Sequence, residues 1–196
     1  MKNVQSMPHR RHYVRSGEHN GSWQARATRG RKSVGPITSG ATREEAVQAV
    51  ISYLDQEAAL ENNTRSKTGV PSPAAYRAAF DAIGPLQRYE DDMLTAHLAA
   101  PGYVLTATEL AAAAGYDNYQ GANRWYGELA RKIAEELEWS PAKRPDGTPM
   151  WTTALATDAN EAGDEHELES GHFRWRLRPE VVEALGLSSL STTGKV

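Results

Sequence analysis

Side chains that could read base pairs recur at helical spacing in the second half of the chain. In GYDNYQGANRWYGELARKIAEEL, residues 115–137, about 100° per residue gathers one polar set on one side of a helix. The set is Gln120, Asn123, Arg124, Gly127, Glu128 and Arg131. Arginine can pair bidentately with guanine, and asparagine or glutamine with adenine, in the major groove of DNA. The solvated face of an ordinary amphipathic helix has the same composition, so residue types alone leave both interpretations open.

Gly127 lies in the middle of this polar set. A glycine inside a helix costs roughly 1 kcal/mol relative to alanine, so we expect something to offset it. Its missing side chain would let a phosphate or a backbone come close, and close packing against another helix explains it equally well. The opposite side of the helix is apolar and should be buried. That predicted buried stripe is Ala122, Trp125, Tyr126, Leu129, Ile133 and Leu137.

Basic residues are concentrated at the front of the chain. Residues 1–43 hold nine Lys and Arg residues and a single acid, Glu18, whereas residues 44–196 hold 13 basic and 24 acidic residues. The front is therefore the better candidate for contact with a polyanion. The predicted phosphate contacts are Arg26, Arg29, Arg31 and Lys32. In the competing interpretation Trp23 is a core residue and these basic side chains are only solvated.

A run of acidic residues opposes a simple DNA-binding role. The segment TDANEAGDEHELESG, residues 157–171, contains no Lys or Arg, so phosphate would repel it. We expect a solvated flexible loop, or else a surface that meets a basic protein or imitates the charge of DNA. The acids concerned are Asp158, Glu161, Asp164, Glu165, Glu167 and Glu169.

The sequence offers no catalytic or cofactor-binding pattern. There is no Cys, so disulfides, thiol nucleophiles and thiolate metal sites are excluded. No G-x-S-x-G, phosphate loop or H-E-x-x-H occurs, and acidic pairs such as Asp91-Asp92 are helix neighbours that do not face each other. His97 is expected to be a satisfied, partly buried side chain. We therefore expect no enzyme activity, metal or cofactor.

Hydropathy and the N-terminal residues bear on location. No run approaches 18 apolar residues, so no membrane span is expected. The basic start, MKNVQSMPHRRHYVRSG, lacks the apolar region of a secretory signal. We expect a cytoplasmic protein.

Two structural modules are expected to position these side chains, which suits a length of 196 residues. After a basic flexible tail at 1–11, residues 12–35 predict strands, with a hairpin at Asn20-Gly21. Thr42 and Glu45 have capping-box spacing before an apolar stripe at helical intervals. Residues 12–60 therefore predict a small sheet covered by one helix, and polar residues 61–73 a linker.

The second module spans residues 74–188. Two helices fill 74–100, with a break at Gly84-Pro85. A second capping box, Thr106 and Glu109, starts a short helix that ends at Gly115, and a longer helix follows at about 119–138. MWTTALA and FRWRLR predict two strands, with Arg174 and Arg176 on the outer face as further DNA contacts. A last helix starts at Pro179, before a flexible tail at 189–196.

The fold class is thus α+β: a small β-sheet-plus-helix N-terminal domain followed by a helical, winged helix-turn-helix domain. In the second module the pattern Gly115-Tyr116-x-Asn118-Tyr119-x-x-x-Asn123-x-x-Tyr126-Gly127-x-Leu129-Ala130 and the closing FRWRLRPEVVEALGL carry a resemblance. The run from about Tyr76 to Leu187 resembles a winged-helix-like domain found beside HNH endonuclease domains in bacterial restriction-type proteins. The resemblance implies a DNA-associated module without catalysis, because the nuclease half is absent.

The first module carries a second resemblance. GSWQARATRGR followed by GPITSGATREEAVQAVISYL resembles the AP2-like arm-binding modules of phage integrases, and equally the HicB-like folds of antitoxins. Both combine a three-stranded sheet with one helix. The integrase resemblance implies that the sheet meets DNA.

Three functional hypotheses follow. The first is a non-catalytic protein of a phage or mobile element that binds double-stranded DNA. Its base or groove contacts would be Asn118, Gln120, Asn123, Arg124 and Arg131. The second is a phage-encoded inhibitor of a bacterial defence system, anti-CRISPR or anti-restriction, that contacts a host defence complex through the acidic loop or an apolar helix surface. The third is a HicB-like regulator, which should form a homodimer.

Overall fold

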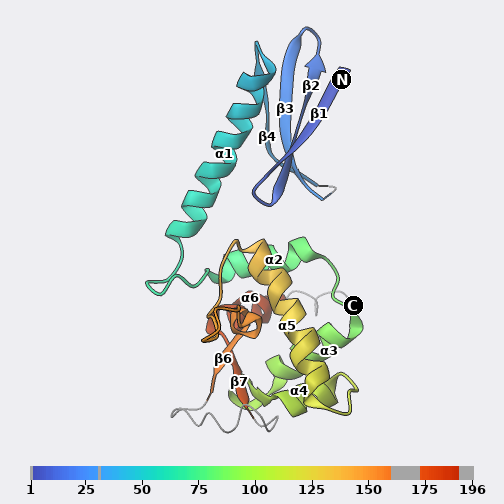
Figure 1. Ribbon diagram of the computed structural model, residues 1–196, viewed down its shortest axis with the longest axis vertical. Helices are drawn as coiled ribbons and strands as arrows, with labels where there is room; N and C mark the ends of the chain where they lie inside the picture. The colour runs from blue at the N-terminus through green and yellow to red at the C-terminus, as the bar shows by residue number, and fades with distance from the viewer. Residues whose placement is uncertain (1, 31, 160–172, 190–196) are drawn as a thin grey trace. The chain divides into compact units, whose positions relative to one another are not determined.

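The chain folds as two compact units of mixed α and β structure, as Figure 1 shows. The computed structural model describes residues 2–30, 32–159 and 173–189. The N-terminal unit is Met1–Val70 and the C-terminal unit Pro71–Val196, so their boundary falls inside the segment 61–73. The expected α+β class is confirmed.

Four antiparallel strands form the sheet of the N-terminal unit. They are β1 (Lys2–His9), β2 (His12–His19), β3 (Ser22–Arg29) and β4 (Lys32–Gly40), in the order β1-β2-β3-β4. The predicted Asn-Gly hairpin is confirmed, because His19 pairs with Ser22 across Asn20 and Gly21, both at positive φ. Two-residue turns join β1 to β2 and β2 to β3, and β4 pairs with β3, so sequence neighbours are also sheet neighbours.

The prediction of a flexible tail at 1–11 was wrong. Residues 2–9 form β1, which pairs with β2 from His9↔His12 to Gln5↔Ser16. Only Met7 of this strand packs against the core, so the apolar alternation that marks a strand is missing from the sequence. Backbone pairing, not apolar burial, places this segment in the sheet.

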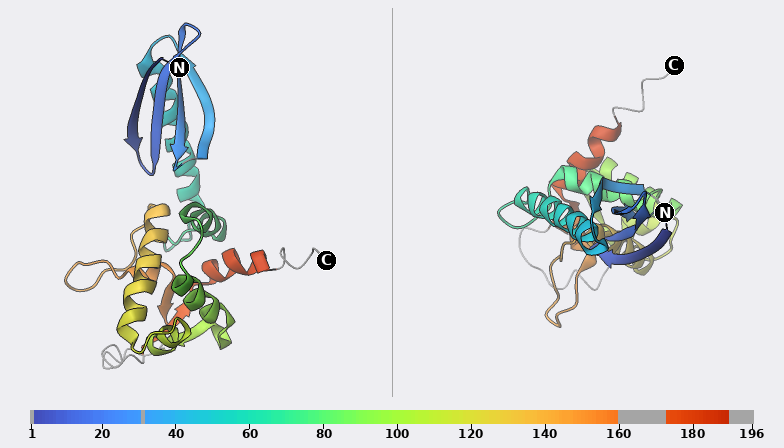
Figure 2. Two further views of the ribbon diagram at one scale, coloured as in Figure 1. Left: turned by 90° about the vertical axis from the view of Figure 1, so that its right-hand side faces the viewer. Right: turned by 90° about the horizontal axis from the view of Figure 1, so that it is seen from above.

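One helix, α1 (Arg43–Asn63), covers one side of this sheet, as Figure 2 shows. The predicted capping box is confirmed: Glu45 N–H donates to Thr42 Oγ1 at 3.2 Å, and Thr42 N–H donates to Glu45 Oε2 at 3.4 Å. The helix buries an apolar stripe against small and β-branched side chains of β2 and β3. This core is Val14, Ala25, Ala27, Ala46, Val47, Val50 and Leu54.

The C-terminal unit is built mainly from helices. They are α2 (Pro73–Ile83), α3 (Arg88–Ala99), α4 (Ala107–Ala113), α5 (Tyr119–Glu136) and α6 (Pro179–Ser189). Three short strands, β5 (Val104–Thr106), β6 (Ala156–Asp158) and β7 (Arg174–Leu177), form an antiparallel sheet in the order β5-β7-β6. Two 3₁₀ turns complete the unit, η1 (Pro101–Tyr103) and η2 (Trp151–Ala154).

The buried stripe of the long helix is as predicted, with one exception. Ala122, Tyr126, Leu129 and Ile133, together with Leu137 just after the helix, are almost fully buried. Trp125 is only partly buried, and its ring lies 4.9 Å from that of Tyr89 on α3. The apolar stripe therefore ends at an aromatic contact near the surface.

The predicted strand MWTTALA is instead η2 followed by β6. Thr153 Oγ1 donates to Met150 O at 2.7 Å and accepts from Ala142 N–H at 3.2 Å, which ties the turn to itself and to the preceding loop. Tyr76 Oη donates to Ala154 O at 2.6 Å. Bonds within the turn, together with those to Ala142 and Tyr76, hold this segment in a 3₁₀ turn against its local β pattern. The other predicted strand, in FRWRLR, is confirmed as β7, with Trp175 and Leu177 buried.

Candidate nucleic-acid interface

The side of the N-terminal sheet opposite α1, called here the open face, is defined by strand register. Directly paired residues project to the same side, and sides alternate along each strand. Val14, Ala25 and Ala27 pack on α1, so the residues between them face away from the helix. The register places two neighbouring rows there: Pro8, Tyr13, Thr28 and Ser33, and then Ser6, Arg15 and Arg26.

No carboxylate from β1 to β4 lies on the open face. The only acid in residues 2–40 is Glu18. Its register partner on β3 is Trp23, which packs against the core on the α1 side. The open face therefore presents positive charge with no opposite charge from its own strands.

Arg15 and Arg26 stand directly opposite each other on β2 and β3. Within the described residues, neither guanidinium has a hydrogen-bond or ion-pair partner. Like charges directly opposite on neighbouring strands destabilise a sheet. Repulsion between the two guanidinium groups therefore destabilises the free protein. A bound anion would remove this repulsion and form charge-assisted hydrogen bonds with both groups.

Exposed apolar surface accompanies these arginines. Tyr13, two residues from Arg15 on β2, leaves 57% of its surface exposed, and Ile37 on β4 leaves 63%. An exposed tyrosine beside unpaired guanidinium groups suits a ligand that presents phosphates next to less polar surface.

Only some of the basic residues that the sequence predicts as phosphate contacts lie on the open face. Arg26 lies on it. Arg29 and Lys32 are register partners on the side of Ala27 near the β3–β4 turn, and Arg31 lies outside the described residues. Trp23 packs against the core, as the competing interpretation held.

Sequence reasoning missed Tyr13 and Arg15 as site residues. The signal was present, because His12, Val14 and Ser16 alternate with Tyr13 and Arg15 in HYVRS. Period-2 alternation would have assigned the two sets to opposite faces of one strand.

Several side chains of the polar face of α5, which the sequence predicts to contact DNA, form contacts within the helix itself. The side-chain oxygen of Asn118 caps the helix, accepting from Gln120 N–H at 3.0 Å and Gly121 N–H at 3.3 Å. Arg131 forms ion pairs with Glu128 and Glu135, and hydrogen bonding from Arg131 lowers the pKa of Glu128. The guanidinium of Arg124 lies over the Trp125 ring, 4.7 Å from its centroid. Gln120, Asn123 and Arg124 remain exposed.

Gly127 is partly buried beside the η2 turn. A Cβ added there would lie 3.8 Å from Thr152 Oγ1 of η2, an ordinary van der Waals distance. The η2 turn is the neighbour on this side of the helix, which favours packing over phosphate contact as the reason for the glycine. Close packing was expected to involve another helix. The neighbour that the structure shows is a 3₁₀ turn.

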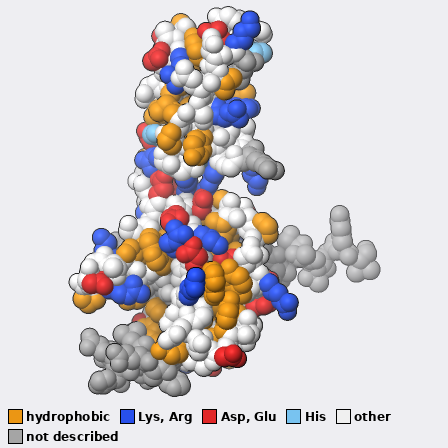
Figure 3. Space-filling model, turned by 45° about the vertical axis from the view of Figure 1, so that its right-hand side comes forward, with side chains coloured by type: hydrophobic (Ala, Val, Ile, Leu, Met, Phe, Trp, Pro, Cys, Tyr) orange, Lys and Arg blue, Asp and Glu red, His pale blue; other side chains and the backbone are white. Residues whose placement is uncertain are grey.

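The remaining nominated residues lie on or near the second sheet. Arg174 and Arg176 are exposed on β7, opposite Thr106 and Val104 of β5. Asp158 ends β6, whereas Glu161, Asp164, Glu165, Glu167 and Glu169 lie outside the described residues. On the side of the molecule shown in Figure 3, basic, acidic and apolar side chains are interspersed.

His97 is fully buried, not partly buried as expected, and has two partners. Its Nε2 lies 3.0 Å from Trp175 O, and its Nδ1 lies 2.8 Å from Tyr126 Oη. A carbonyl oxygen only accepts, so Nε2 carries the proton and Nδ1 accepts from the tyrosine hydroxyl. Burial lowers the pKa of His97 and raises that of Tyr126. This is a neutral structural pair that joins α3, α5 and β7.

Two features of the described residues concern metal binding and membrane insertion. Across 2–30, 32–159 and 173–189, no group of three or more His, Asp or Glu side chains is placed to hold a metal ion. In the same residues, no helix combines the length and apolar character that crossing a membrane requires.

Comparison with known proteins adds no relative: the chain matches no family model, and no curated protein or solved structure is significantly similar to it.

Proposed function

We propose that the protein is a non-catalytic DNA-binding protein whose principal contact surface is the open face of the N-terminal sheet. The observation that carries this proposal is the Arg15–Arg26 pair, which has no partner in the described residues and no carboxylate beside it on that face. Phosphate fits two unpaired guanidinium groups, since arginine binds it bidentately. A duplex offers two such charges for every base pair.

The α4–α5 pair is proposed as a second, weaker contact. A short helix, a turn and a longer helix, followed by strands, have the element order of a winged helix-turn-helix domain. In this proposal Gln120, Asn123 and Arg124 make the groove contacts. Arg131 contributes less, because Glu128 and Glu135 already neutralise it.

The test is binding of a random-sequence duplex, followed by fluorescence anisotropy at several salt concentrations. The full chain should bind with a dissociation constant in the range of roughly 10⁻⁴–10⁻⁶ M that is usual for non-specific binding at physiological salt. The double variant Arg15→Gln/Arg26→Gln should bind more weakly. Its slope of log affinity against log salt should fall by about 2, one for each lost phosphate contact.

A control variant with the same charge change separates local contact from net charge. Lys67→Gln/Lys143→Gln also removes two positive charges, from exposed side chains outside the sheet. It should keep the slope of the unaltered protein. Equal binding by the Arg15/Arg26 variant would refute the sheet contact. No duplex binding by the unaltered chain at low salt would refute the function and favour the host-defence inhibitor that acts by protein contact.

A further inference from the structure

A pocket in the C-terminal unit lies between α3 and the turn that joins α4 to α5. Its volume is about 480 Å³, within the roughly 300–1,000 Å³ usual for small-molecule sites. The lining residues are Arg88, Tyr89, Asp92, Ala112, Ala113, Ala114, Gly115 and Tyr116. None of them belongs to the open face of the N-terminal sheet.

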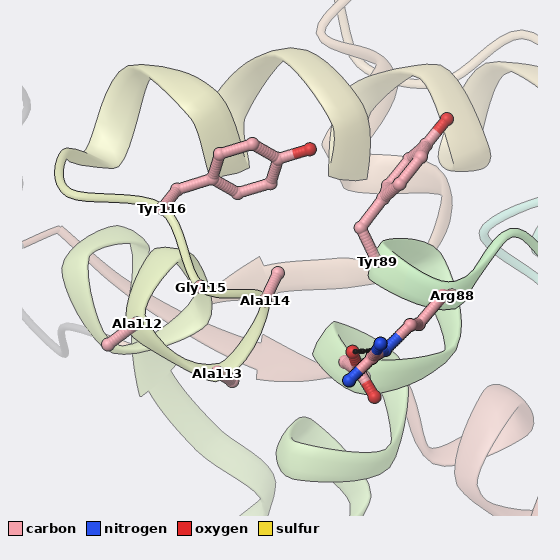
Figure 4. A pocket seen from close by; sticks show the side chains of 8 residues that line it. Arg88, Tyr89, Ala112, Ala113, Ala114, Gly115 and Tyr116 are labelled. Carbon is pink, nitrogen blue, oxygen red and sulfur yellow. Dashed lines mark ion pairs between the residues drawn. The ribbon is translucent and has the colours of Figure 1, made fainter.

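Two tyrosines form the walls of this pocket. Figure 4 shows the rings of Tyr89 and Tyr116 beneath α5, on two sides of an opening, with the methyl group of Ala114 pointing between them. Within the described residues, neither hydroxyl has a hydrogen-bond partner. Figure 4 also shows the Tyr116 hydroxyl turned toward Tyr89, whereas the Tyr89 hydroxyl points away from Ala114 and Arg88, so the walls offer flat apolar faces and one polar group.

Both rings are held in place from behind. A Cβ on Gly121 of α5 would lie only 2.9 Å from Tyr116 Cγ, so the ring takes a position that requires this glycine. Tyr89 packs on Trp125 with ring centroids 4.9 Å apart, and Arg124 covers the Trp125 ring at 4.7 Å. Walls that are already fixed lose little conformational freedom when a ring enters.

Hydrogen-bonding groups line the α3 side. Arg88 Nε lies 3.7 Å from Asp92 Oδ2, and the side chains are 95% and 42% exposed. An exposed pair at this distance is weak and opens easily. It offers donors and acceptors side by side, which matches the edge of a heterocycle that carries both.

We propose that this pocket binds an unpaired nucleobase, held between Tyr89 and Tyr116 with its polar edge toward Arg88 and Asp92. Stacking on aromatic side chains accepts any base, because every base has a π-face. The main competing occupant is an aromatic side chain of a partner protein, which has flat faces but a less polar edge. The proposal does not depend on DNA binding by the sheet.

Neutral nucleosides test the site without involving phosphate contacts. Guanosine, adenosine, cytidine and thymidine lack phosphates, so the arginines of the open face add little to their binding. Saturation-transfer difference NMR on the full chain should detect binding of at least one of them. Raising the salt concentration should leave that binding nearly unchanged, since no counterion release accompanies it.

Two variants and a matched control locate the binding. Ala114→Leu should fill the opening and Tyr116→Leu should remove one stacking wall, each weakening binding by about tenfold or more. Ala99→Leu makes the same alanine-to-leucine change at the exposed last residue of α3, outside the pocket, and should bind like the unaltered chain. Circular dichroism and thermal melting establish that each variant is folded.

Three outcomes would overturn the proposal. One is the absence of binding by all four nucleosides. Another is equal binding by folded Ala114→Leu and by the unaltered chain. The third is binding of tryptophan or phenylalanine amide at this pocket when no nucleoside binds, which would assign the site to a protein partner instead.

Discussion

Arg131 and Asn118 are both engaged by groups of the helix α5. The guanidinium of Arg131 could contact a guanine base, but it forms ion pairs with two glutamates of its own helix. Asn118 has the amide of an adenine reader, yet it caps that helix. Arg15, in contrast, stands unpaired among the described residues and is the stronger candidate for an anion.

His97 leads to a prediction about pH and stability. Burial holds its pKa below the ordinary value, so between the two values the unfolded chain binds more protons than the folded one. Stability should therefore be fully present above about pH 6.5, the unfolded histidine value, and should decline as pH falls toward the lower folded pKa. Urea unfolding across this range, monitored by tryptophan fluorescence, measures the effect.

The variant His97→Gln serves as the control for this titration. It is expected to lower the free energy of unfolding at neutral pH, because a buried hydrogen-bond partner is altered. The decline with acid should become shallower than in the unaltered chain. An unchanged pH dependence in this variant would show that other groups cause the decline.

At the level of elements, ion pairs with α1 hold the β1–β2 turn in place and add to the backbone pairing of β1 with β2. His9 and Arg10 both contact Asp55 Oδ1, at 3.0 and 2.8 Å, and Arg11 contacts Glu61 at 2.7 Å. The hydrogen bond from Arg10 lowers the pKa of Asp55 most, and the hydrogen bond from His9 adds to this effect. The β1–β2 turn is thus attached to the second half of α1, and its charge is neutralised within the unit.

Two glycines of α5 should respond oppositely to the same substitution. Gly127→Ala places its methyl group at an ordinary contact distance, so it should raise the free energy of unfolding by roughly 0.5–1 kcal/mol. Gly121→Ala drives its Cβ to 2.9 Å from the Tyr116 ring. It should therefore lower stability by roughly 1–3 kcal/mol, as overpacking does.

Chemical denaturation of the two glycine variants, measured side by side, checks this prediction. Each serves as the control for the other, because the same glycine-to-alanine change is made in the same helix. Equal stabilisation by the two substitutions would mean that Tyr116 is free to move, and would weaken the case for a preformed pocket.

At the level of the whole molecule, charge divides between the two units. The N-terminal unit carries 11 basic and six acidic residues, and the C-terminal unit 11 basic and 19 acidic. A fragment of residues 1–70 has its own core and should fold cooperatively, although so small a domain is expected to be only marginally stable.

This fragment should bind duplex DNA with most of the affinity and salt dependence of the full chain. A fragment of residues 71–196 should bind at least tenfold more weakly, about 1.4 kcal/mol less favourably. Anisotropy on both fragments measures this, with circular dichroism to establish folding. Stronger binding by the C-terminal fragment would move the principal contact to α5.

Local signals in the sequence determined much of the secondary structure. Thr42 with Glu45 and Thr106 with Glu109 marked two helix starts, and Asn20-Gly21 marked a hairpin, because caps and tight turns depend on residues a few positions apart. The buried stripe of α5 followed from helical periodicity in the same way. The spacing of the basic residues likewise showed which part of the chain is cationic.

Only the tertiary structure decided which of those charges remain available. Three contacts decided this, and each joins residues on different elements. They are the pairing of β1 with β2, the packing of the η2 turn beside Gly127, and the register that sets Arg15 opposite Arg26. The aromatic walls of the pocket come from α3 and from the α4–α5 turn. Such contacts depend on how elements pack, and a periodic pattern fixes a face of one element but not what lies against it.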